Sequence, residues 1–303
     1  MADAGHIRIT EVGPRDGLQN ESAVVEVPDK VTFVDLLSRS GPAEIEVSSF
    51  VSSEWVPQLA DAEAVFAGIT RAPGVLYSAL VPNEQGLDRA LGARVDKVSH
   101  FTAASEAFCV RNTNASIDET FNRLGPVVTG ARAAGLPIRG YISCVVACPY
   151  EGPIDPRRVR DIAARLLDAG VEEIDLGETI GVAVPSDIER LYDGLADLIA
   201  PADTTLHLHD TRGTALAGAV TAMGLGVRSF DVSCGGLGGC PYAPGAAGNL
   251  ATEDLVYLCD RMGRPTGVDL KALFEAARHI GRVLGRALPG RVFNADGKQT
   301  GGN

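Results

Sequence analysis

The chain has 303 residues and carries 27 Lys and Arg against 39 Asp and Glu, a formal net charge of -12 at pH 7. Binding to nucleic-acid backbones requires clustered Lys and Arg, so this balance argues against a nucleic-acid partner. No apolar run approaches the roughly 20 residues that span a bilayer, which argues against a membrane protein. Strand-like sequence begins within the first ten residues, so we expect no targeting segment and a cytoplasmic protein.

Short segments rich in Val, Ile, Leu and Thr recur along the chain and predict eight strands. They are HIRITEVG from residue 6, AEIEVSS from 43, GVLYSALVP from 74, VDKVSHFTA from 95, IRGYISCVVA from 138, VEEIDLGET from 171, TTLHLHD from 204 and SFDVSCGG from 229. Segments with helical apolar spacing lie between them, starting at residues 29, 116, 155 and 214. These four helices are expected to end at Gly41, Gly135, Gly170 and Gly226, because glycine is a common helix stop signal.

This alternation of strands and helices predicts the α/β class with a parallel sheet. Eight such units in about 250 residues match the closed (β/α)8 TIM barrel in size. A doubly wound open sheet is the alternative, but no GxGxxG opens the first helix after a strand. We expect one domain over residues 1–303: a barrel over about 6–265, then a C-terminal helical cap and flexible tail over about 266–303.

Two of the five histidines stand one residue apart in the segment TTLHLHD. Strand side chains alternate between faces, so His207 and His209 are predicted to point into the barrel, with Leu206 and Leu208 toward the helices. Both histidines come near the C-terminal mouth, where active sites of this fold lie. Paired histidines on a strand are more often hydrogen-bonded core residues than a metal site, so neighbouring polar groups decide the interpretation.

Polar residues follow other predicted strands at the same mouth. Asp16 lies in EVGPRDGLQNE after the first strand, and Asn249 lies in the loop after the eighth. One carboxylate, two imidazoles and one amide oxygen form a mixed oxygen and nitrogen set. Such a set suits Mg²⁺ or Mn²⁺ with open water positions better than tetrahedral zinc.

Several long segments carry a resemblance to the hydroxymethylglutaryl-CoA lyase family. They are EVGPRDGLQNE at 11–21, SFVSSEWVPQLAD at 49–61, FTAASEAFCVRNTNASIDE at 101–119, RGYISCVVACPYEG at 139–152, LHLHDTRGTALA at 206–217 and GLGGCPYAPGAAGNLATEDLVY at 236–257. The resemblance implies a (β/α)8 barrel and a requirement for a divalent cation. It also implies cleavage of the acyl-CoA substrate 3-hydroxy-3-methylglutaryl-CoA to acetyl-CoA and acetoacetate.

Site residues follow from the resemblance position by position. The family's metal ligands correspond to Asp16, His207, His209 and Asn249, and its catalytic residues to Arg15, Glu46 and Cys240. The resemblance also places Arg15, Gln19, Glu178 and Arg212 at the substrate, and Asn112 and Ser116 at coenzyme A.

Glutamate and cysteine each occur more than once near these positions. Glu44 and Glu46 share a strand face, and a glutamate there could simply pair with an arginine inside the barrel; the resemblance favours Glu46. Cys240 follows five loop residues, four of them glycine, so it can move over the mouth and exchange a proton. The other five cysteines are interpreted as buried free thiols: Cys109, Cys144, Cys148, Cys234 and Cys259.

Two residues depart from the family pattern, which usually has Asp where this chain has Glu178 and Tyr where it has Arg212. One interpretation is mutual compensation, in which Glu178 reaches toward the barrel axis and pairs with Arg212. The other is a pocket reshaped for a different acyl end, so that another 3-hydroxy-3-alkyl acyl-CoA is the better substrate.

Two other functions, a condensing enzyme and a non-catalytic binding protein, agree less well with these residues. Condensing enzymes that resemble the isopropylmalate and homocitrate synthases carry HxHND where this chain has HLHDT. A barrel that only binds a ligand would not need to keep the whole set of metal and catalytic residues. A homodimer is possible, and the sequence indicates no further partner.

Overall fold

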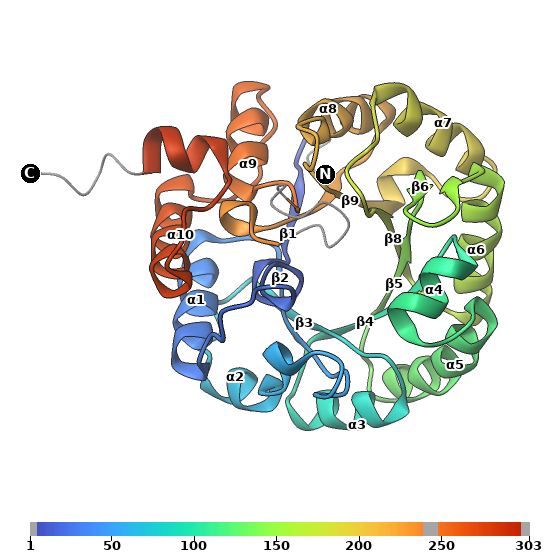
Figure 1. Ribbon diagram of the computed structural model, residues 1–303, viewed down its shortest axis with the longest axis horizontal. Helices are drawn as coiled ribbons and strands as arrows, with labels where there is room; N and C mark the ends of the chain where they lie inside the picture. The colour runs from blue at the N-terminus through green and yellow to red at the C-terminus, as the bar shows by residue number, and fades with distance from the viewer. Residues whose placement is uncertain (1–4, 239–247, 298–303) are drawn as a thin grey trace, which may run out of the picture.

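The computed structural model describes residues 5–238 and 248–297. Eight parallel strands close into a barrel in the spatial order β1-β10-β9-β8-β5-β4-β3-β2 (Figure 1), which confirms the predicted TIM barrel. The barrel strands are β1 (Arg8–Glu11), β2 (Glu44–Ser49), β3 (Leu76–Leu80), β4 (Lys97–Ala103), β5 (Ile138–Ser143), β8 (Glu173–Glu178), β9 (Thr204–Leu208) and β10 (Ser229–Val232). Each of the eight predicted segments contains one of them.

Helices form a ring outside the strands, as Figure 1 shows. They are α1 (Val27–Ser40), α2 (Ala62–Gly68), α3 (Glu84–Gly92), α5 (Ile117–Ala133), α6 (Pro156–Ala169), α7 (Pro185–Leu195), α8 (Ala215–Leu225) and α9 (Thr252–Arg261). Helix α4 (Glu106–Thr113) and the short hairpin β6 (Ala147–Cys148) and β7 (Gly152–Pro153) are insertions after β4 and β5. Within residues 5–238 and 248–297, no helix is long and apolar enough to cross a membrane.

Glycine ends several helices as the sequence predicted. Gly41, Gly170 and Gly226 follow α1, α6 and α8 with φ of 81°, 99° and 114°. This left-handed conformation disfavours residues with a Cβ atom, so glycine marks these ends in the sequence.

The chain continues past the barrel into α10 (Leu270–Leu284) and a short turn at Phe293–Gly297. Figure 1 shows α10 lying outside α1 and beside α9. The segment after α10 returns to the barrel, because the backbone N–H of Gly290 donates to the carbonyl of Gly235 at 2.8 Å. Gly235 lies three residues after β10 ends at Val232, so the C-terminal segment supports the site end of the barrel.

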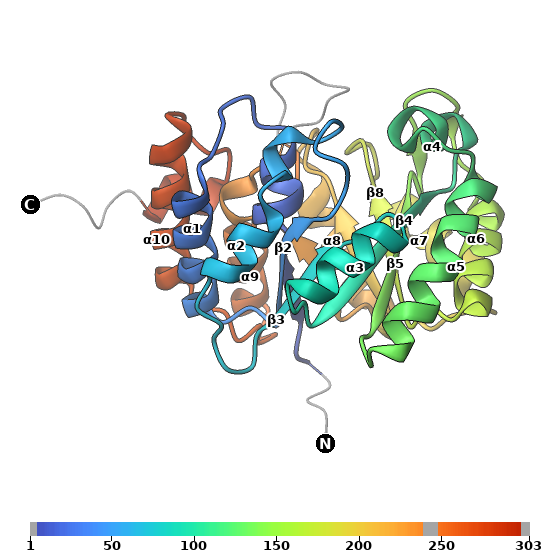
Figure 2. The same ribbon diagram turned by 90° about the horizontal axis from the view of Figure 1, so that it is seen from below.

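The outward strand faces are apolar, whereas the barrel lumen is polar. In Figure 2 the chain enters the barrel from below, so the N-terminal ends of the parallel strands lie at the lower end of the barrel. There, two carboxylates each contact all three cations of a partly buried group, here called the lower cluster. Its members are Arg8, Glu44, Lys97, Arg139 and Glu173. Glu44 thus pairs with arginines inside the barrel, and the polar layer above the lower cluster leads to the mouth.

Candidate functional site

A single π-helical turn, Gly13–Gly17, follows β1 and presents Arg15 and Asp16 to the mouth. The backbone N–H groups of Asp16 and Gly17 both donate to the carbonyl of Val12, at 2.8 and 3.1 Å. A Cβ atom at Gly13 would stand 2.6 Å from a Glu11 oxygen, and one at Gly17 would stand 2.9 Å from Leu237 Cβ. The two glycines of GPRDG therefore allow the tight packing that this turn needs.

Asp16 meets the two histidines of β9 at the mouth. Asp16, His207 and His209 each offer a ligand atom, and these atoms lie within 4.8 Å of one another. Asn249 forms an isolated bridge with His209, and its side-chain amide donates to Asp16 Oδ2 at 2.8 Å and to the Leu237 carbonyl at 3.1 Å. These four residues are called the ligand cluster below.

The ligand cluster contains polar atoms that the protein itself does not satisfy. Among the described residues, His209 Nδ1 and Asn249 Oδ1 are buried without a hydrogen-bond partner. Buried polar atoms are rarely left in this state, because an unmade hydrogen bond costs about 1–3 kcal/mol. A carboxylate, two imidazoles and a free amide oxygen are suitable ligands for a divalent cation, so these residues fit the metal that the sequence predicted.

Arg15 lies beside the ligand cluster and is 7% exposed. Its guanidinium bonds to Glu46 through Nε, contacts Asp16 Oδ1 at 2.5 Å and lies 5.4 Å from the centre of the Tyr141 ring. Burial opposes the charge of Arg15, but Glu46 and Asp16 outweigh it and raise its pKa. Arg15 therefore remains a fixed cation directed at the mouth.

The two carboxyl groups that flank Arg15 respond differently to burial. Burial opposes ionisation of Asp16, but Arg15 and the two histidines hold its pKa below the usual range. Burial raises the pKa of Glu46, and the opposing charge of Arg15 offsets this only in part. Asp16 is thus anionic and ready to bind a cation, while Glu46 acts as the partner that orients Arg15.

A cavity of about 520 Å³ opens above the ligand cluster. Arg15, Asp16, His207 and His209 line its floor, and Gln19 and Asn112 line its walls. Its apolar lining consists of Val51, Trp55, Val56, Leu80, Pro82, Phe101, Phe108 and Ile142. The cavity is large enough for a small acyl group and joins the ligand cluster to helix α4, which carries Asn112.

Other predicted site residues have structural contacts away from the cavity lining. Ser116 caps α5 by accepting from the Glu119 N–H at 3.1 Å. Glu178 is buried and accepts from the Val182 N–H at 3.0 Å, and burial raises its pKa. Arg212 donates to the carbonyls of Ile180 and Gly181 at 2.9 and 3.1 Å.

Glu178 and Arg212 therefore do not form the ion pair that one of the two sequence interpretations proposed. Both residues lie in the described part of the chain. They bond to the backbone of the same loop, residues 180–182, and not to each other. Glu178 accepts from a peptide N–H of that loop, while Arg212 donates to two of its carbonyls. Gly177 and Thr179 line the cavity, whereas Glu178 between them does not.

The cysteines fall into two groups. Cys240 lies outside the described residues. The other five are free and buried, as the sequence predicted: Cys109, Cys144, Cys148, Cys234 and Cys259.

Sequence reasoning missed three residues that surround the ligand cluster: Arg139, Tyr141 and Asp231. Arg139 and Tyr141 share the inner face of β5, and both donate to Asp231 on β10. The sequence does carry a signal for this group. Arg139 in IRGYIS and Asp231 in SFDV are charged residues at inward positions of otherwise apolar strands.

A family model described as HMGL-like matches residues 6–280. The chain belongs to this family. A Pseudomonas aeruginosa relative named 3-hydroxy-3-isohexenylglutaryl-CoA/hydroxy-methylglutaryl-CoA lyase is 48% identical over 289 residues, which cover 95% of this chain and 96% of the relative. A Rattus norvegicus relative named 3-hydroxy-3-methylglutaryl-CoA lyase, cytoplasmic, is 45% identical over 293 residues, which cover 97% of this chain and 85% of the relative.

Solved structures of the same family agree with the fold. The crystal structure of hydroxymethylglutaryl-CoA lyase from Pseudomonas aeruginosa matches with a TM-score of 0.94 at 47% identity, covering 96% of this chain and 97% of the other. A structure of an HMG-CoA lyase from Acinetobacter baumannii, in complex with coenzyme A and 3-methylmalate, matches with a TM-score of 0.92 at 36% identity. It covers 100% of this chain and 99% of the other.

Proposed function

We propose that this chain is a lyase that cleaves 3-hydroxy-3-methylglutaryl-CoA to acetyl-CoA and acetoacetate. The observation that carries the proposal is Arg15 held directly beside Asp16, His207, His209 and Asn249 on the floor of the cavity. The names of full-length relatives at 45–48% identity support the same reaction. The bond that breaks joins C2 and C3 of the acyl chain, the 3-hydroxyl loses its proton, and the thioester fragment leaves as an enolate.

The cofactor of this proposal is Mg²⁺ or Mn²⁺, held by the ligand cluster. When bound, the ion would lower the pKa of the substrate's 3-hydroxyl and favour loss of its proton. The unsatisfied ring nitrogen of His209 and amide oxygen of Asn249 support this assignment.

Arg15 is proposed as the group that stabilises the enolate oxygen. A guanidinium keeps its charge throughout the reaction and offers several donors in a fixed plane. Glu46 bonds to Nε, so the terminal nitrogens are directed away from Glu46 toward Asp16 and the cavity. Such preorganised charge typically contributes about 10²–10³-fold to the rate.

The remaining roles concern proton transfer and binding. Cys240 is proposed to exchange the proton that converts the enolate to acetyl-CoA. Gln19 lines the cavity near Arg15 and is proposed to contact the substrate, and Asn112 to contact coenzyme A. Contacts of Ser116 with coenzyme A, and of Glu178 and Arg212 with substrate, stay predictions.

A second candidate is a lyase for a 3-hydroxy-3-alkyl acyl-CoA with a longer branch. The apolar wall of the cavity favours it, because eight apolar side chains exceed what one methyl branch requires. The name of the Pseudomonas aeruginosa relative includes such a substrate, 3-hydroxy-3-isohexenylglutaryl-CoA. Glu178 and Arg212 could shape this preference through the loop that they hold.

One substrate panel tests both candidates. Thioesters with a methyl or a longer 3-alkyl branch are incubated with Mg²⁺ or Mn²⁺, and acetyl-CoA release is followed in the native chain and in Glu178→Asp/Arg212→Tyr. We expect efficient cleavage of the methyl substrate that the double change does not improve. Two results together would establish the second candidate. The native chain would cleave the thioester with the longer branch better than the methyl thioester, and the double variant would shift this substrate preference toward the methyl thioester by up to about 1–3 kcal/mol. No cleavage of any thioester would refute the lyase.

Compartment and assembly complete the proposal. The names of relatives place some in the cytoplasm and others in mitochondria. We propose the cytoplasm for this chain, and a homodimer stays a prediction.

A further inference from the structure

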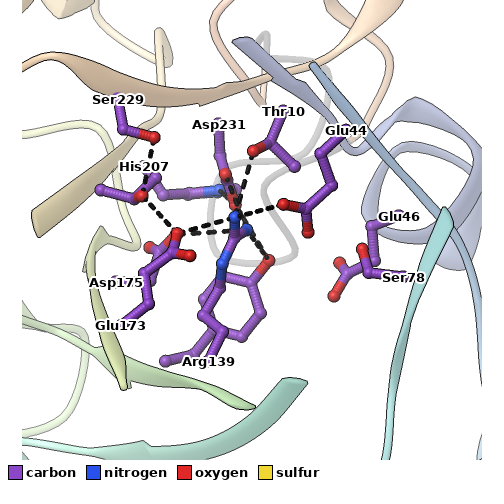
Figure 3. Close-up of polar contacts among 12 residues, drawn as sticks. Thr10, Glu44, Glu46, Ser78, Arg139, Glu173, Asp175, His207, Ser229 and Asp231 are labelled. Carbon is purple, nitrogen blue, oxygen red and sulfur yellow. Dashed lines mark hydrogen bonds and ion pairs between the residues drawn. The ribbon is translucent and has the colours of Figure 1, made fainter. Parts of the chain in front are cut away.

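Asp231 lies in the barrel lumen, directly behind the ligand cluster. It is 1% exposed, and its two oxygens face different partners (Figure 3). Oδ1 accepts from Arg139 Nη1 at 3.1 Å, and Oδ2 accepts from the Tyr141 hydroxyl at 2.9 Å. A carboxylate with a donor on each oxygen cannot rotate freely, so its position is fixed by β5.

His207 is the next neighbour of Asp231 on the inner face. Strands β9 and β10 are paired in a register that sets Asp231 opposite His207. His207 Nδ1 lies 3.7 Å from Asp231 Oδ2, and this nitrogen has no hydrogen-bond partner within the described part of the chain. At that distance the interaction is electrostatic and not a hydrogen bond. The Nδ1 edge of the imidazole is turned toward Asp231.

An imidazole has two nitrogens on different edges of the ring. With Nδ1 directed at Asp231, Nε2 is the nitrogen left for the ion that Asp16 and His209 would share. Carboxylates that face the second nitrogen of a histidine commonly fix its tautomer and its orientation toward a metal. A ring held in this way does not need to be reoriented when the cation arrives.

Arg139 connects this arrangement to the lower cluster. Its guanidinium is fully buried and also donates to Thr10 Oγ1 and to Glu44, both at 3.1 Å. Figure 3 shows Arg139 at the centre of these contacts. Contacts from several strands therefore restrain the movement of Arg139. Arg139 in turn restrains the movement of Asp231.

We propose that Asp231, held by Arg139 and Tyr141, is a positioning residue that sets the orientation of His207 for metal binding. The inference rests on the proposed role of the ligand cluster as a divalent-metal site. It assigns Asp231 no contact with substrate.

Asp231→Asn tests the proposal, with Glu44→Gln as the matched control. Glu44 is another fully buried lumen carboxylate that bonds to Arg139, at 3.1 Å, but it belongs to β2 and to the lower cluster. The readouts are the Mn²⁺ dissociation constant of the folded protein and the melting temperature without metal. Asp231→Asn is expected to weaken Mn²⁺ binding by about 10–100-fold, whereas Glu44→Gln leaves it within about twofold.

Tyr141→Phe provides a second variant, because it removes only one donor to Asp231. It should weaken Mn²⁺ binding by a few fold while the protein remains folded. Equal loss of affinity in Asp231→Asn and Glu44→Gln, or no loss in Asp231→Asn and Tyr141→Phe, would overturn the proposal. Failure of the native chain to bind Mn²⁺ would instead refute the metal site itself, so the two failures are distinguishable.

Discussion

The two ends of the barrel lumen are both polar and buried, but they differ in how their charged groups are partnered. In the lower cluster, Glu44 and Glu173 each contact Arg8, Lys97 and Arg139, although Glu44 Oε1 and Arg139 Nε make no hydrogen bond within the described ranges. In the ligand cluster, His209 Nδ1 and Asn249 Oδ1 have no protein partner among the described residues and lie beside Asp16. Opposite charges paired within the barrel support the fold, whereas unpartnered ligand atoms beside a carboxylate fit a bound cation.

The carboxyl groups of these regions differ in the same way. Burial opposes the ionisation of Glu44 and Glu173, but nearby Arg139 and Lys97 hold the pKa of each below its ordinary value. Outside the lumen, near the mouth, burial raises the pKa of Glu11 to about 7 and of Glu253 to about 8. Glu253 accepts from the Gly235 N–H at 2.8 Å, three residues after β10 ends at Val232. No cation is among the main influences on either Glu11 or Glu253.

The largest expected effect is in the ligand cluster, for the variant His207→Ala. Loss of an imidazole ligand should abolish measurable Mn²⁺ binding. A bound cation supplies several kcal/mol of transition-state stabilisation, and each 1.4 kcal/mol is about tenfold, so kcat/KM should fall by roughly 10³-fold. His279→Ala on α10 is the control and should retain affinity and rate. Full turnover by His207→Ala in excess chelator would contradict the comparison.

The variant Lys97→Met disrupts the lower cluster. Lys97 is 2% exposed and bonds to Glu44 at 3.0 Å and to Glu173. Removing one partner of a buried ion pair typically costs about 3–5 kcal/mol, so the free energy of unfolding in urea should fall by roughly that amount. Mn²⁺ affinity of the folded protein should not change, and the exposed control Lys271→Met should stay within about 0.5 kcal/mol of the native chain. Weakened Mn²⁺ binding in Lys97→Met would show that the two ends are not separate.

Glu253→Gln gives the smallest and most specific effect, on the pH dependence of stability. A carboxyl with a raised folded-state pKa stabilises the protein below its unfolded pKa of about 4.5, and this contribution is lost as pH rises through the folded value. The melting temperature should therefore fall between about pH 5 and pH 8 in the native chain, and fall less in Glu253→Gln. The exposed Glu275→Gln should keep the native slope. An unchanged slope in Glu253→Gln would show that Glu253 does not ionise in this range.

The sequence by itself determined the barrel and most of the residues proposed for the site. Apolar strands alternating with glycine-stopped helices indicate a (β/α)8 barrel because strand and helix periods are local properties of the chain. The HLH spacing likewise assigns both histidines to one face, since alternation along a strand does not depend on the rest of the fold. The meeting of Asp16 and Asn249 with these histidines is also predictable, because all of them follow strands that end at one mouth.

Only the tertiary structure decided which charges are partners. Glu44 and Glu46 are two residues apart on one face, yet one joins the lower cluster and the other holds Arg15, because the lumen brings different strands to each level. Arg212 binds the carbonyls of Ile180 and Gly181 rather than Glu178, since loop geometry sets the distances between side chains. Arg139 reaches Asp231 across 92 positions of the chain, a contact that depends on barrel closure and strand register, which local sequence periodicity cannot specify.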